Sequence, residues 1–262
     1  MELKPLILNR ILILSTLAFA LGFVIFGRIE QPQWYHEFAD DRTFFGIPNT
    51  ADVLSNLALL IPGVIGLALV KEMHQKGGGY SDPFELVIIA SLFAGITLTF
   101  IGSMWYHLEP NDATMIWDRM PMTIVFASIC SLVIADRMSV ELAKKIHVPL
   151  MITGIISVLL WHWTGDLRPF FFFKHEPIII IVTLLIFGKA TYDRETDYFI
   201  ALGLFLLATV LELADSTIYG ITTIISGHTL KHILAGIACW VLLRMIQTRT
   251  ALNPHHLSSA EE

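Results

Sequence analysis

The chain has 262 residues, of which 55% are hydrophobic and only 15% are charged. Soluble domains usually carry about a quarter charged residues, so this composition disfavours a soluble domain, and its apolar content excludes disorder and collagen-like sequence. The net charge of -6 and the lack of a basic patch argue against a nucleic-acid partner. Cys130 and Cys239 lie inside apolar runs, so we expect packing residues and no disulfide framework.

Apolar runs follow one another along the whole chain. A membrane-spanning helix needs about 20 mostly apolar residues. The candidate runs, of which the sixth is the shortest, are 6–26, 53–70, 84–106, 116–135, 146–163, 177–190, 198–214 and 229–246. The sequence therefore predicts an all-α, polytopic membrane helix bundle with short loops.

The first run has two interpretations. Residues 1–28 are expected to form an N-terminal transmembrane anchor, followed by a seven-helix membrane domain (29–250) and a cytoplasmic tail (251–262). Ala18-Phe19-Ala20 resembles a signal-peptidase site, but the apolar run continues to Phe26, longer than a typical signal segment. An uncleaved anchor is favoured, and cleavage would leave the other seven helices in the same orientation.

Basic residues predict the orientation. With the N-terminus in the cytoplasm and eight alternating helices, 11 of the 17 Lys and Arg residues face the cytoplasm. The other six, on the outer side, are Arg28, Arg42, Arg119, Arg168, Lys174 and Lys231. Cytoplasmic loops carry the excess of positive charge, so both termini are expected in the cytoplasm.

Polar residues that are distant in sequence fall at one membrane depth. His107 ends the third predicted helix, Asp118 starts the fourth, and His228 and His232 begin the eighth. His162, Glu212 and Asp215 are expected at the same outer face. Ionisable groups inside a membrane are costly and usually functional. No cluster of basic residues is expected there to balance them.

The spacing of these residues indicates a metal site. Ser103 and His107 share a helical face, as do His228 and His232. Three neutral imidazoles and one water make an open tetrahedral zinc site. Singly, each group has a simpler interpretation: a hydrogen-bonded His at the interface, a Ser bonded to its own helix, or an Asp favoured by the helix dipole. Their convergence favours the metal site.

The loop after the first helix is a second candidate site. Its acidic residues include Asp40 and Asp41, and oxygen ligands suit calcium. The loop has no EF-hand spacing. A solvated acidic loop in which Thr50 or Asp52 caps the next helix is an equal alternative.

These motifs together resemble the alkaline ceramidases. The set is Ser103-x-x-x-His107, Asp118 eleven residues later, and His228-x-x-x-His232. The segments 45–49, 55–57, 117–123 and 226–232 resemble the bacterial ceramidase-like branch of the seven-helix membrane hydrolases, a superfamily that includes adiponectin-receptor-like proteins. The resemblance covers about residues 35–245 and makes 29–250 a ceramidase-like core.

The resemblance implies functional residues. It implies a zinc ion held by His107, His228 and His232, with Ser103 and Asp118 as catalytic residues and Ser55, Asn56 and Asp215 as supporting polar groups. It also implies a calcium ion in the loop, with Asp40, Asp41 and Asn49 as candidate ligands. The sequence departs from the family there, because Asn49 stands where alkaline ceramidases carry Glu.

The sequence thus predicts a zinc-dependent amidohydrolase that cleaves the N-acyl amide of a ceramide-like membrane lipid with a long acyl chain. Asp118 would carry the proton, and Ser103 would donate to the oxyanion. In a bacterium it would lie in the inner membrane with its active site on the periplasmic side. The main alternative is a lipid-sensing receptor whose structural zinc takes His162 or Asp118 as fourth ligand; a transporter fits less well. The exact lipid, an ester in place of an amide, and the oligomeric state stay open.

Overall fold

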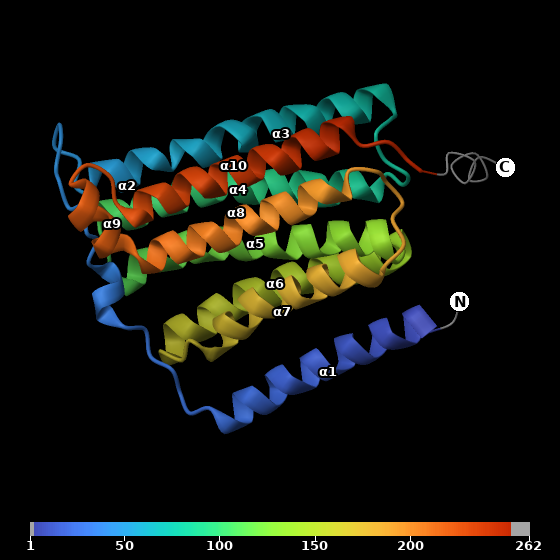
Figure 1. Ribbon diagram of the computed structural model, residues 1–262, viewed down its shortest axis with the longest axis horizontal. Helices are drawn as coiled ribbons and strands as arrows, with labels where there is room; N and C mark the ends of the chain where they lie inside the picture. Colours follow the sequence, from blue (N-terminus) through green and yellow to red (C-terminus); the bar gives the residue numbers. More distant parts are fainter. Residues whose placement is uncertain (1–2, 253–262) are drawn as a thin grey trace.

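The computed structural model describes residues 3–252 and shows an all-helical bundle (Figure 1). Its helices in chain order are α1 (Leu3–Ile25), η1 (Gln33–His36), α2 (Thr50–Ser55), α3 (Leu57–Lys76), α4 (Phe84–Leu108), α5 (Asp112–Arg137), α6 (Val140–Thr164), α7 (Arg168–Phe187), α8 (Glu195–Leu213), α9 (Asp215–Thr222) and α10 (Gly227–Thr248). The predicted tail, 251–262, lies outside the described residues from 253 onward.

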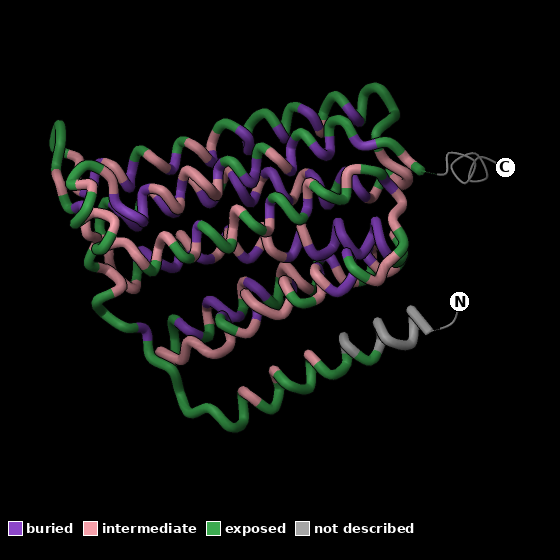
Figure 2. The backbone as a smooth tube through the Cα atoms, viewed as in Figure 1, coloured by how far each residue is buried: buried purple, intermediate pink, exposed green. Residues whose placement is uncertain are grey.

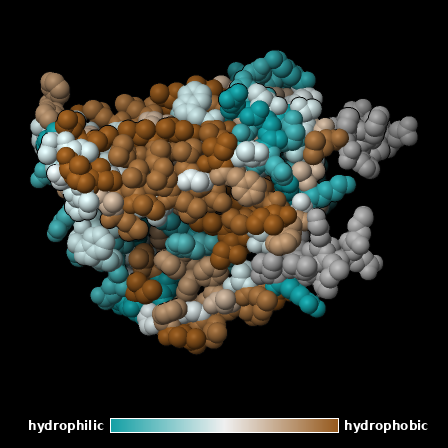
Figure 3. All heavy atoms as spheres, in the orientation of Figure 1, coloured by the Kyte–Doolittle hydropathy of each residue, from teal (hydrophilic) through white to brown (hydrophobic). Residues whose placement is uncertain are grey.

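Within residues 3–252, seven helices are long and apolar enough to cross a membrane. These are α2–α3 taken together, α4, α5, α6, α7, α8 and α10. Helix α1 adds a shorter apolar stretch, Ile13–Ile25, and its crossing of the membrane stays a prediction. Hydrophobic side chains cover most of the middle of the face shown in Figure 3, as expected for a multi-pass membrane protein.

Several predicted boundaries were wrong, and local chemistry explains them. Helix α5 begins at Asp112, ahead of the predicted residue 116, because Asn111 forms a capping box with Thr114. Helix α7 begins at Arg168, ahead of residue 177, because its first turns carry charged residues that an apolar-run criterion rejects. The seventh run is followed by a separate short helix, α9, which was not predicted.

The core lies among α3, α4, α5, α6, α7, α8 and α10, and α1 stands apart from it. Helices α4 and α5 run side by side, and α10 packs between α3 and α8 (Figure 1). Helix α1 contacts α7, where Phe19 and Phe23 meet the ring of Phe172. None of the described α1 side chains is buried (Figure 2). This arrangement fits an accessory helix beside a seven-helix core.

The two ends of the bundle differ. The beginning of α1 and the end of α10 lie at one end, and the loop over residues 26–49, α2 and α9 lie at the other (Figure 1). The end of α4 and the beginning of α10 also lie at that second end. The bundle therefore brings the predicted site residues to the end opposite the beginning of α1 and the end of α10.

Candidate metal and lipid site

Three histidines meet at this end of the bundle, as predicted. His107, His228 and His232 are all buried, and each offers one ring nitrogen within 4.8 Å of the others. Their ring centroids are 4.8, 4.8 and 4.9 Å apart. Within residues 3–252 this set, called the His cluster below, is the one group of three or more His, Cys, Asp or Glu side chains placed to hold a metal.

The helix that carries two of these histidines is positioned by its first residues. The Ser226 hydroxyl caps α10 by accepting from the Thr229 N–H at 3.0 Å. Gly227 follows, and a Cβ atom there would overlap the Leu211 carbonyl oxygen of α8. Only glycine allows this close approach. Because α10 starts against the end of α8, His228 lies beside Glu212, with Nδ1 3.9 Å from the carboxylate.

Polar groups around the His cluster fix its rings and backbone. The Ser55 hydroxyl lies 2.8 Å from Nδ1 of His232, which leaves Nε2 of that ring toward the cluster. Asp215 accepts from the His228 N–H at 2.7 Å, and the Asn49 amide donates to the His107 carbonyl at 2.8 Å. Metal-binding histidines usually have such partners. Ser55 and Asp215 thus contact two of the three histidines, and the supporting roles that the resemblance implies for them stay a prediction.

The loop before α2 covers the His cluster. The Phe38 ring centroid lies 4.6 Å from that of His107 and 4.8 Å from that of His228. The next residue, Ala39, donates its N–H to Asp215 at 3.0 Å. The loop therefore keeps bulk water away from the imidazoles.

The donor set fits a metal ion. Nδ1 of His107 is buried without a hydrogen-bond partner, and an unsatisfied buried polar atom is costly unless a ligand takes it. Three imidazoles suit zinc. Neither His162 nor Asp118 belongs to the group of possible ligands, and His162 is exposed. Among residues 3–252, the cluster therefore offers three possible protein ligands and no fourth His, Cys, Asp or Glu.

An apolar cavity of about 190 Å³ ends beside this cluster. Its polar lining includes Ser103, Asp118, Lys231 and His232. The rest is mostly aliphatic and aromatic and includes Leu59, Ile96, Met122, Val125, Phe126, Ile129, Ile178, Ile181, Leu202, Phe205 and Leu242. Such a shape, apolar with a few polar groups at one end, is typical of a lipid or small-molecule site.

A close helix contact brings Ser103 and Asp118 together. A Cβ atom on Gly102 would overlap the Trp117 carbonyl oxygen, so α4 and α5 touch at this level. The Ser103 side chain consequently lies against the Asp118 carboxylate. The expectation that Asp118 starts a helix was wrong, because α5 begins at Asp112. Asp118 lies inside the helix, so the helix dipole does not account for it.

The expectation that no basic residues balance the acids here was also wrong. Nζ of Lys231 donates to Glu212 at 2.6 Å and lies 3.3 Å from Nε2 of His228. Tyr35 donates its hydroxyl to the same Glu212 oxygen at 2.8 Å. Burial, together with the Glu212 carboxylate, raises the pKa of Tyr35 well above its usual value, so the phenol stays a donor. The i, i+3 spacing of His228 and Lys231 was the signal that could have shown this.

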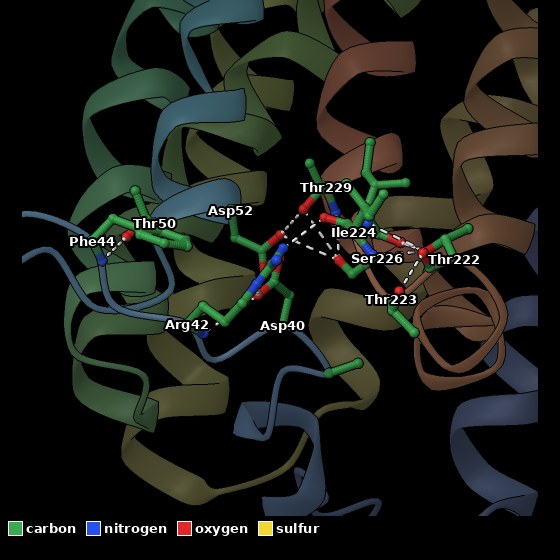
Figure 4. A network of polar contacts seen from close by, with 12 residues as sticks. Asp40, Arg42, Phe44, Thr50, Asp52, Thr222, Thr223, Ile224, Ser226 and Thr229 are labelled. Carbon is green, nitrogen blue, oxygen red and sulfur yellow. Dashed lines mark hydrogen bonds and ion pairs between the residues drawn. The ribbon is translucent and has the colours of Figure 1, made fainter.

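The three candidate calcium ligands do not meet as a group. Both carboxylate oxygens of Asp40 accept from Arg42, at 2.7 and 2.6 Å, and Arg42 also donates to the Ile224 carbonyl (Figure 4). These hydrogen bonds from Arg42 lower the pKa of Asp40. Asp41 is exposed, and the Asn49 amide serves His107. Calcium stays a prediction that these contacts do not favour.

The expected helix caps near this loop were also wrong. Thr50 is the first residue of α2, and its hydroxyl accepts from the Phe44 N–H at 2.8 Å. Asp52 is fully buried and accepts from the Thr229 hydroxyl at 2.6 Å (Figure 4). Asp52 therefore ties α2 to the beginning of α10, and so to the helix that carries His228 and His232.

Comparison with known proteins adds no assignment. No protein-family model matches the chain, and no curated protein matches it.

Proposed function

We propose that this chain is a zinc-dependent intramembrane amidohydrolase of the alkaline ceramidase type, which cleaves the N-acyl amide bond of a ceramide-like lipid. One observation carries the proposal. The His cluster lies at the polar end of an apolar cavity, and Ser103 and Asp118 line that same cavity. Metal donors, a proton carrier, a hydrogen-bond donor and space for an acyl chain thus occur at one place.

His107, His228 and His232 would hold the zinc ion, with Ser55 orienting the ring of His232. When bound at such a site, zinc activates water and polarises a carbonyl. Catalytic zinc sites have three protein ligands and an open fourth position, as this donor set does. A structural zinc in a lipid-sensing receptor would call for His162 or Asp118 in that position, so the donor set favours the hydrolase.

Asp118 and Ser103 have separate tasks in the proposed reaction. Asp118, half-buried in the cavity wall, accepts a proton from the attacking water and delivers it to the leaving amine. The Ser103 hydroxyl donates a hydrogen bond to the carbonyl oxygen as negative charge develops there. One such donor lowers the barrier by about 3 kcal/mol.

The apolar part of the cavity would hold the acyl chain. Each methylene that leaves water contributes about 0.8 kcal/mol, so long-chain lipids should bind better than short ones. We therefore propose a membrane lipid with a long acyl chain as the substrate.

A product assay tests this function. Purified protein in detergent micelles is offered long-chain lipid amides and the matching esters, with and without a zinc chelator, and products are identified by mass spectrometry. Chelator-sensitive release of fatty acid from an amide is expected. A metal-loaded protein that hydrolyses no lipid in the panel would refute the hydrolase and favour the receptor.

We further propose that both termini face the cytoplasm. The proposal rests on the split of the 17 Lys and Arg residues, 11 toward the cytoplasm and six toward the outer side, because cytoplasmic loops carry the excess of positive charge. Lys145→Cys and Glu30→Cys test this, since both positions are exposed and both native cysteines are buried. An impermeant maleimide should label position 30 in intact cells, and labelling of position 145 would reverse the orientation.

A further inference from the structure

Lys231 is the one Lys or Arg in the described lining of the cavity. It precedes the metal-ligand candidate His232 on α10 and is partly buried, with its side chain 21% exposed. An ammonium group beside an apolar cavity is costly to bury. It therefore needs a reason beyond packing.

Glu212 forms an ion pair with Lys231 from outside the cavity lining. Its carboxylate accepts from Nζ at 2.6 Å and also from the Tyr35 hydroxyl, and it does not line the cavity. The other neighbour of Nζ is His228 at 3.3 Å. The ion pair thus fixes the ammonium beside the His cluster, on a side chain that lines the cavity.

The single negative charge of Glu212 interacts with two lysines. Lys174 of α7 interacts electrostatically with Glu212 as well, although it does not line the cavity. Asp118 also attracts Lys231, from the cavity wall. An ammonium so placed forms a strong, charge-assisted hydrogen bond with a negative oxygen entering the cavity and a weaker one with a neutral group.

We propose that Lys231 is a specificity-determining residue that selects lipid amides with a carboxylate beside the scissile bond, the class of N-acyl amino acids. This inference rests on the proposed hydrolysis of a lipid amide, and it favours a headgroup that carries a carboxylate over the uncharged headgroup of a ceramide. In an N-acylglycine one carbon separates the amide nitrogen from the carboxylate. When the amide carbonyl lies at the His cluster, the carboxylate lies close to it, as Nζ of Lys231 does.

A matched pair of lipids isolates the charge. N-oleoylglycine and N-oleoylglycinamide have nearly the same size, and only the first is anionic. The protein should cleave the glycine lipid with a kcat/KM about tenfold or more above that of the glycinamide, the order expected for a hydrogen bond to a charged group. Lys231→Met should abolish the difference in kcat/KM between the two lipids by raising the KM for N-oleoylglycine. Lys231→Arg should keep most of the difference.

Two further variants control for folding and for general electrostatics. Lys231→Met with Glu212→Gln removes both charges, so it leaves no unpaired carboxylate, and it should also lose the preference. Lys174→Met removes a neighbouring cation that does not line the cavity and should keep the preference. A ratio that survives the double variant would overturn the role of Lys231.

A binding experiment separates this inference from the hydrolase itself. Chelator-treated protein in micelles is loaded with a pyrene-labelled fatty amide, and each of the two lipids is used to displace it. N-oleoylglycine should displace the probe at about a tenfold lower concentration, and Lys231→Met should remove the difference. This preference without any hydrolysis by zinc-loaded protein would refute only the proposed function. Hydrolysis of both lipids with equal kcat/KM and equal displacement would refute only the inference.

Discussion

Buried charges gather at both ends of the helix bundle, and the two sets are built differently. Near the end of α10, Glu85, Tyr192 and Arg249 form what is called here the latch cluster. Arg249 donates to Glu85 at 2.7 Å, Tyr192 donates to Glu85 at 2.8 Å, and the Arg249 guanidinium lies 3.9 Å from the Tyr192 ring centroid. These contacts join α4, the loop before α8 and the segment after α10.

The His cluster and the latch cluster are both buried, but only one of them lies beside the apolar cavity. Each end has buried polar atoms without partners, on His107 at one and on Arg249 at the other. Only the His cluster adjoins the 190 Å³ cavity, through His232. A buried ionisable group in a membrane bundle is therefore not by itself a sign of chemistry. What separates the two ends is a space beside the groups in which a ligand can lie.

The largest expected effect is loss of the metal. His228→Ala removes one of three ligands, so the purified variant should lose its zinc and its hydrolytic activity. His162→Ala is the matched control, because His162 is exposed and outside the His cluster. Elemental analysis of both variants measures the outcome. Stoichiometric zinc in His228→Ala would disprove this ligand set.

Substitution in the latch cluster should lower the stability of the protein and leave its zinc content unchanged. Arg249→Met leaves the Glu85 carboxylate buried and without its cation, and breaking a buried pair in this way costs about 3–5 kcal/mol. Thermal unfolding in detergent should therefore shift strongly, while the folded fraction keeps its zinc. Arg28→Met, which removes an exposed partner of Glu30, should unfold like the parent protein. Zinc loss from folded Arg249→Met would show that the two ends are coupled.

Smaller effects should follow from the groups that line the cavity without holding metal. Ser103→Ala should lower turnover about 100-fold, the order expected for one oxyanion donor. Asp118→Asn should lower it further, because it removes the proton carrier and keeps the shape. Fatty-acid release is measured at equal zinc occupancy. If the parent is active and both variants match its rate, these roles are wrong.

Local patterns predicted most of the fold and the group of three histidines that could hold a metal ion. Runs of apolar residues report membrane helices directly, and the i, i+4 pair at His228 and His232 states which helix face they share. Placing His107 beside them required only that alternate helices return to the same side. Ser103 and Asp118 were expected at the same membrane depth for the same reason. The close approach of α4 and α5 at Gly102 brings their side chains into contact.

The parts that were missed depend on side chains reaching across helices. Glu212 meets Lys231 because α10 starts close to α8 at Gly227, and it meets Tyr35 of η1 from the loop; hydrophobic periodicity shows neither contact. Lys174 was assigned to a loop because charged residues interrupt the apolar run, although they lie within α7. Asp40 was considered a metal ligand because sequence does not show that Arg42 already occupies its oxygens.

The smallest expected effect concerns the ion pair of Asp40 and Arg42, in the loop that covers the His cluster. Asp40 is buried, and its pKa is held below the usual value of about 3.9 by the Arg42 guanidinium. A carboxyl group whose pKa is depressed by folding stabilises the native state fully above its unfolded pKa. That contribution is lost as the pH falls through the folded pKa. Arg42→Met should therefore lower the thermal midpoint at pH 7, and the gap from the parent protein should narrow below about pH 4.

Part of the gap should persist in acid, because Arg42 also donates to the Ile224 carbonyl, a bond that does not titrate. The shift should be smaller than that of Arg249→Met, since the Arg42 side chain is 36% exposed and solvent screens the pair. Thermal unfolding of both proteins in one detergent from pH 7 to pH 3 measures this, with Arg28→Met as the control for an exposed arginine. A gap that stays constant down to pH 3 would mean that the carboxylate of Asp40 does not stabilise the loop over the His cluster, and that the Ile224 contact alone holds Arg42 there.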